Sequence, residues 1–133
     1  MQSHVLTIET GRRLVTDVTR QVQRACDGRG DGLVNLFVPH ATCGLALMEV
    51  GSGSEDDLAG ILDDLLPQAD RYRHRHGTTG HGRDHVLPAF VSPSLSIPVL
   101  GGEPQLGTWQ SVVIVDTNVD NRTRTLRISF LRG

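Results

Sequence analysis

Apolar residues along this chain gather in short runs separated by turn-forming residues, which is the pattern of β-strands. The last run alternates, with Leu126, Ile128 and Phe130 apolar and the residues between them polar. Such alternation is typical of an antiparallel strand with one face on a core. Strands are therefore expected at 4–9, 33–38, 43–50, 95–100, 109–115 and 124–130.

Two other segments repeat apolar residues at helical spacing. In the first, Val18 and Val22 lie on one stripe, and Thr16 is expected to cap the helix. The second helix is expected to begin with Ser54 as its cap and to end at Pro67. Together they predict an α+β fold, with about six or seven strands in a mixed or antiparallel sheet and two helices packed on one side of it.

Composition narrows the class of protein. The 133 residues make one domain by size, spanning 1–133, and an apolar content of 38 % favours an oligomer, because association buries further apolar surface. A net charge of −2 gives no electrostatic surface for nucleic acid, and no apolar run is long enough to span a membrane. Cys26 and Cys43 lack Cys-x-x-Cys spacing, and no signal peptide is evident, so a reduced, cytoplasmic setting is expected.

Histidine carries the strongest chemical signal. His40 leaves a predicted strand, and His74, His76, His81 and His85 crowd into a polar, Gly-rich segment that is interpreted as a long loop. A catalytic zinc site uses three protein ligands and one open position. His40, His74 and His85 would converge if this loop folds over the strand end; solvated loop residues are the alternative. No helical His-x-x-x-His or similar motif of fixed geometry is recognised here, so spacing alone gives a metal site limited support. His76 and His81 are interpreted as solvent-exposed or auxiliary.

Two acidic residues follow apolar runs, Glu49 after one predicted strand and Asp116 after another. A carboxylate at the end of a buried strand needs a partner, so each is a candidate base, orienting group or ligand-binding residue. A strand-end acid that faces water is the alternative.

Two further pairs are candidates for binding. Trp109 and Gln110 can stack on and hydrogen-bond a planar ligand, or the tryptophan can anchor the core or a subunit contact. Arg122 and Arg124 are two residues apart and are expected on one strand face, where paired guanidiniums suit phosphate or carboxylate. A solvated sheet edge is the alternative for the arginines.

Several of these residues belong to longer sequence blocks, of which Leu106-Gly107-Thr108-Trp109-Gln110 is the most specific. The others are His40-Ala41-Thr42-Cys43-Gly44-Leu45-Ala46-Leu47-Met48-Glu49, Tyr72-Arg73-His74, Asp84-His85, Ile97-Pro98-Val99 and Arg122-Thr123-Arg124. In order and spacing, these blocks resemble the motif pattern of the YjbQ family, described as secondary thiamine-phosphate synthases.

The resemblance implies an α+β homotrimer with a histidine metal site near the subunit boundary, holding a divalent ion such as zinc. It implies that a small, phosphorylated substrate binds there, as in the joining of a pyrimidine diphosphate to a thiazole phosphate. Carried onto this sequence, the metal ligands are His40, His74 and His85, the catalytic residues Glu49, Arg122 and Arg124, and the ligand-binding residues Thr42, Trp109, Gln110 and Asp116.

The sequence departs from the family pattern at Ala41, Cys43 and Met48, where the family has Thr, Thr or Ser, and Asn. Three functions therefore stay open. The first is a thiamine-phosphate synthase-like transferase. The second is a metal-dependent hydrolase in which Glu49 accepts a proton from zinc-bound water. The third, which the departures favour, is a non-catalytic trimer that binds a metal or small ligand.

Overall fold

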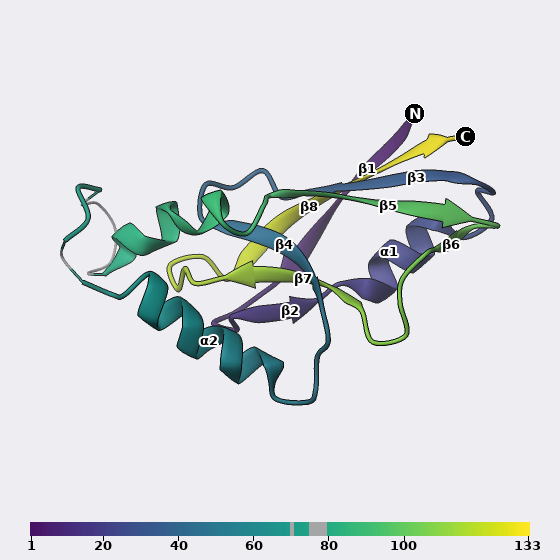
Figure 1. Cartoon of the computed structure of the whole chain (residues 1–133). Helices are drawn as coiled ribbons and strands as arrows, with labels where there is room; N and C mark the ends of the chain where they lie inside the picture. The colour runs from purple at the N-terminus through teal and green to yellow at the C-terminus, as the bar shows by residue number, and fades with distance from the viewer. Residues whose placement is uncertain (70, 75–79) are drawn as a thin grey trace.

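The computed structural model describes residues 1–69, 71–74 and 80–133, and its strands form two sheets (Figure 1). All the pairings between described strands are antiparallel. The larger sheet has the order β1-β8-β3-β5-β6, which is Gln2–Glu9, Thr123–Arg132, Gly32–Phe37, Ser94–Leu100 and Glu103–Pro104. The smaller has the order β2-β7-β4, which is Val15–Asp17, Ser111–Asp116 and Cys43–Met48. The helices are α1 Thr19–Cys26, α2 Ser54–Leu65 and the 3-10 helices η1 His81–His85 and η2 Leu87–Ala89.

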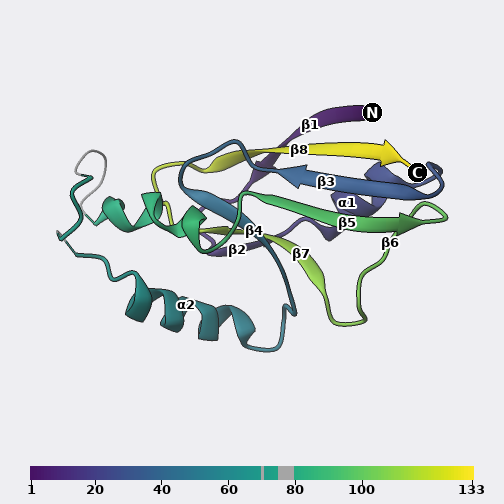
Figure 2. The same ribbon diagram turned by 45° about the horizontal axis from the view of Figure 1, so that its top comes forward.

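The smaller sheet lies in the middle of the fold and is buried on both faces (Figure 2). On β7, Val112 and Ile114 belong to the core shared with the larger sheet and α1. Val113 and Val115, on the opposite face, pack with α2 and η2. A continuous run of β-branched residues is what a strand covered on both faces requires.

The predicted α+β class is confirmed, with two corrections. The strands divide between two sheets instead of one, because β7 pairs with β2 on one side and β4 on the other, and none of the three pairs with a strand of the larger sheet. The two helices do not share one side, because α1 packs in the first apolar cluster and α2 in the second. No helix in the described part of the chain is long and apolar enough to cross a membrane.

The helix starts also differ from expectation. Thr16 lies within β2, and Asp17 instead accepts hydrogen bonds from the backbone and hydroxyl of Thr19, at 2.9 and 2.6 Å. Ser54 is the first residue of α2 and caps nothing; the preceding Gly53 has a φ of 98°, which a residue with a Cβ rarely adopts. Both caps were misplaced by one position or more because sequence pattern fixes helix ends poorly.

Gly44 in β4 provides a test of this packing. A Cβ at this position would overlap the Val91 carbonyl, while the neighbouring Leu45 amide donates to the Ser92 carbonyl at 2.7 Å. Gly44→Ala is therefore expected to lower the free energy of unfolding by about 1–3 kcal/mol, measured by urea denaturation. Gly60→Ala is the matched control: nothing lies within 4 Å of its Cβ, so it should raise stability by up to about 1 kcal/mol. Equal stability of the two variants would contradict the close approach.

Candidate metal centre

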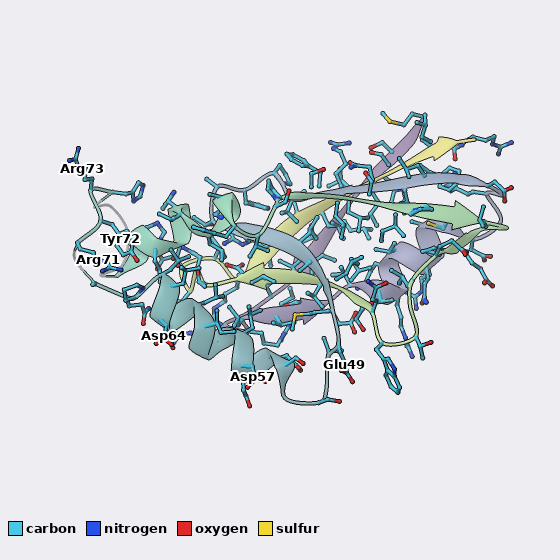
Figure 3. The ribbon with its side chains drawn as sticks, in the orientation of Figure 1. Glu49, Asp57, Asp64, Arg71, Tyr72 and Arg73 are labelled. Atoms are coloured by element: carbon cyan, nitrogen blue, oxygen red, sulfur yellow. The ribbon has the colours of Figure 1, made fainter. Side chains whose placement is uncertain are left out.

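Three histidines meet where η1 lies against the segment that carries Tyr72. Figure 3 shows Tyr72 beyond the C-terminal end of α2. His74 comes from that segment, and His81 and His85 come from η1. One ligand nitrogen from each lies within 4.8 Å of the others. The His74 and His85 rings stack with centroids 3.6 Å apart, and Nε2 of His81 lies 2.7 Å from Nε2 of His85.

Local packing holds these two segments together. Gly80, with a φ of 81°, turns the chain into η1, and Gly82 faces Tyr72 so closely that a Cβ there would overlap the tyrosine side chain. The Tyr72 hydroxyl donates to the Pro67 carbonyl at 2.8 Å, which ties the segment to the end of α2. Glycine at 82 thus lets residues 71–74 lie directly against η1.

A polar network surrounds the far side of the His81 ring. His81 Nδ1 lies 3.1 Å from an Asp84 carboxylate oxygen, 3.3 Å from one of Asp120, and 2.9 Å from Asn118 Nδ2. The Asp84 carboxylate also accepts hydrogen bonds from the Thr117 hydroxyl at 2.6 Å and from Asn118 Nδ2 at 3.1 Å. The ring of His81 is therefore held from behind, while its Nε2 faces the cluster.

The donor set fits a borderline divalent cation. Neutral imidazole is the nitrogen ligand that zinc prefers, and three such ligands with an open fourth position are typical of catalytic zinc. Ligand nitrogens in a tetrahedral zinc site lie about 3.3 Å apart. The 2.7 Å hydrogen bond between His81 and His85 therefore has to open slightly for both rings to share one ion.

His40 lies outside this group. Its Nε2 accepts a hydrogen bond from the Thr125 backbone amide at 2.8 Å. The pairing of β3 with β8 ends at Phe37 and Arg127, so His40 supplies an acceptor just beyond the last paired residues. Burial, and next the charge of Arg124, lower the pKa of His40 below its usual value, which favours the neutral imidazole.

A buried ion pair lies close to His40. Arg124 donates from Nε and Nη2 to the two oxygens of Asp116, at 2.6 and 2.9 Å, and both side chains are 2 % exposed. Arg124 Nη2 also donates to the Thr42 hydroxyl at 2.8 Å. Burial disfavours the charged guanidinium, but the hydrogen bonds and charge of Asp116 outweigh it, so the pKa of Arg124 is raised. Arg124 stays a cation at any physiological pH.

A cavity of about 450 Å³ is lined by two of the clustered histidines, His81 and His85, and by Arg124 of the ion pair. Among the described residues, Arg124 Nη1 has no hydrogen-bond partner, so the buried arginine keeps a donor available beside the cavity. The lining residues are Pro39, His40, Ala41, Thr42, His81, His85, Asp120, Asn121 and Arg124.

Other predicted residues lie elsewhere in the chain. Met48 pairs with Ser111 at one end of the β4–β7 ladder and Cys43 with Asp116 at the other. Those ends are roughly 17 Å apart. Glu49 lies past the first end, at the N-terminal side of α2 (Figure 3), and the exposed Trp109 and Gln110 precede Ser111 there. A single chain therefore does not bring these three residues to the histidines.

The environments of Arg122 and Arg124 also differ from what the sequence suggested, and Cys43 is buried. Arg122 is exposed and precedes β8, whereas Arg124 is buried, so the two do not form the expected paired surface. Burial raises the pKa of Cys43 to about 12, which excludes it as a thiolate nucleophile at neutral pH.

Sequence reasoning missed His81 and the residues behind it. His81 is only 8 % exposed, so the first alternative, a solvent-exposed side chain, is wrong, and the second, an auxiliary residue, stays a prediction. The signal was present, because His81 and His85 are four residues apart and lie in a short helix. His76 lies outside the described residues. Asp84 was noted only as part of the Asp84-His85 block, without a role, and Asn118 carried no signal.

Comparison with known proteins agrees with this fold. Residues 4–133 match the family described as "UPF0047 protein YjbQ-like". A UPF0047 protein of Mycobacterium tuberculosis is 55 % identical over 133 residues, covering 100 % of both chains. One of Archaeoglobus fulgidus is 31 % identical, covering 95 % of this chain and 98 % of its own. The crystal structure of a hypothetical protein from Aeropyrum pernix K1 superposes with a TM-score of 0.89 at 29 % identity, covering 100 % of each chain. The chain belongs to the YjbQ-like UPF0047 family.

Proposed function

We propose that His74, His81 and His85 bind a divalent metal ion, zinc in the first instance, and that the adjoining cavity binds a small phosphorylated molecule. One observation carries this proposal: three imidazole nitrogens lie within 4.8 Å of one another, and two of their rings line a cavity that also contains Arg124. Metal-assisted chemistry on an anion requires metal ligands next to a cavity and a cationic donor that can bind the anion there. The imidazoles and Arg124 provide these two elements.

The metal ligands, Arg124 and His40 would have separate roles. A bound metal would supply a Lewis acid that stabilises negative charge on an oxygen. Arg124 would donate from Nη1 to a phosphate oxygen, and its pairing with Asp116 fixes the direction of that donor. Neutral His40 lines the same cavity and, because its Nε2 accepts from a backbone amide, carries its hydrogen on Nδ1.

The first candidate reaction is thiamine-phosphate synthase-like transfer, in which cationic groups stabilise the departing pyrophosphate. The position of Glu49 favours this reaction over hydrolysis, because within one chain the carboxylate expected to accept a proton from metal-bound water lies at the other end of β4. The family resemblance also supports a homotrimer, and the two free cysteines, Cys26 and Cys43, support a reduced, cytoplasmic setting. A non-catalytic binding protein remains the alternative that the departures at Ala41, Cys43 and Met48 favour.

The test is metal-dependent product formation. Purified protein would be given a pyrimidine diphosphate and a thiazole phosphate, with a generic phosphomonoester as the hydrolysis arm. We expect thiamine phosphate to form, to fall to background after chelation and to return with Zn²⁺. His4→Ala, which changes an exposed histidine on β1, should leave the rate unchanged. Bound zinc without turnover of either substrate would establish the binding protein instead, and absence of bound metal would overturn the proposal.

A further inference from the structure

Asp84 is a buried acid that is not one of the three clustered ligand residues but lies next to one of them, His81. Asp84 is 4 % exposed, and its two oxygens lie within hydrogen-bond distance of three different side chains. Oδ1 accepts from the Thr117 hydroxyl at 2.6 Å, and Oδ2 lies 3.1 Å from both Asn118 Nδ2 and His81 Nδ1. A carboxylate fixed by three partners is a rigid reference point for the ring of His81.

The surroundings of His81 Nδ1 decide which nitrogen carries the hydrogen. Carboxylate oxygens of Asp84 and Asp120 lie 3.1 and 3.3 Å away. If Nδ1 carried a lone pair, that lone pair would face two negative charges. A hydrogen on Nδ1 instead donates to them and leaves the lone pair on Nε2, which faces the cluster.

Asn118 offers the competing arrangement. Its Oδ1 accepts from the backbone amides of Asp120 and Asn121, at 3.0 and 3.1 Å, so its Nδ2 is fixed 2.9 Å from His81 Nδ1. If Nδ2 donated to Nδ1, His81 would carry its hydrogen on Nε2 and could not bind a metal there. Because Nδ2 also has Asp84 Oδ2 at 3.1 Å as an acceptor, it needs no bond to His81.

We propose that Asp84 is a positioning residue of this metal centre, which holds His81 in the Nδ1–H tautomer and directs its Nε2 at the ion. This inference rests on the proposed metal function. Metal-binding histidines commonly donate their other ring N–H to a carboxylate, and loss of such a partner typically weakens metal binding 10–100-fold.

The experiment compares Asp84→Asn with Asp64→Asn, which removes an equal charge from an exposed position on α2 (Figure 3). Zn²⁺ affinity would be measured by competition with a chromophoric chelator. We expect a loss of about 10–100-fold for Asp84→Asn and no change for Asp64→Asn. The visible spectrum at saturating Co²⁺ should also change only in Asp84→Asn, since a purely structural role would leave the ligand geometry alone.

A second measurement needs no variant and no metal. Long-range ¹H–¹⁵N spectra of the metal-free wild-type protein report the tautomer of each histidine, and His81 should be Nδ1–H. An Nε2–H tautomer, or unchanged Zn²⁺ affinity in a folded Asp84→Asn protein, would overturn the role of Asp84 while leaving the metal site standing. Wild-type protein that binds no Zn²⁺ would overturn both. If Asp84→Asn does not fold, Thr117→Val, which frees Asp84 Oδ1, should weaken Zn²⁺ binding in the same direction.

Discussion

Replacing Arg124 with methionine is expected to lower the free energy of unfolding by about 3–5 kcal/mol. The change leaves the Asp116 carboxylate, whose side chain is 2 % exposed, without the two charge-assisted hydrogen bonds that it now accepts. It also removes the donor to the Thr42 hydroxyl. An isolated buried charge is costly because the interior cannot solvate it. Urea denaturation, followed by circular dichroism, measures the loss.

Arg122→Met is the matched control, because Arg122 lies two residues earlier and is exposed. It should change stability by less than about 0.5 kcal/mol. The double variant Arg124→Met with Asp116→Leu removes both charges and is expected to recover much of the lost stability, because replacing a whole buried pair with apolar residues is often near neutral. A single variant as stable as Arg122→Met would show that the pair contributes nothing to the fold.

The apolar pattern predicted the strands better than it predicted their partners. The run of β-branched residues on β7 indicated a buried strand, and it is buried on both faces. What the run does not encode is the identity of the neighbouring strand. Pairing of β4 with β7 joins segments more than sixty residues apart, and such long-range contacts have no local signal. A single sheet was expected because the sequence pattern carried no information about which strands pair.

The histidine grouping was predicted only in part. His74 and His85 were expected to lie together and do so, but the third histidine beside them is His81, whereas His40, which the resemblance gave as a ligand, lies outside the group. The interpretation of the segment as a loop hid the meaning of the four-residue spacing between His81 and His85. Arg122 and Arg124 show the same limit, because alternation applies only inside a strand and β8 begins at Thr123.

Removing the imidazole of His81 is expected to abolish stable zinc binding, whereas changing His40 should leave it intact. His81→Ala deletes one of the three clustered nitrogens, so its Zn²⁺ affinity should fall by more than about 100-fold, beyond the range for a residue that only orients a ligand. His40→Gln is the matched variant, since its amide oxygen can still accept from the Thr125 backbone amide. Elemental analysis and chelator competition on both proteins provide the comparison.

The two variants distinguish a ligand set that contains His81 from one that contains His40, which the family resemblance alone cannot do. If His40 were a ligand, its Nε2 would have to leave the Thr125 amide, and the edge of β8 would lose an acceptor that the fold now provides. Breaking that bond has a cost, because a backbone amide left without an acceptor costs about 1–3 kcal/mol. Retention of zinc by His81→Ala together with its loss in His40→Gln would therefore mean that metal binding rearranges this end of the sheet. The opposite result places the ion between η1 and the segment at 71–74, with His40 free to face the substrate.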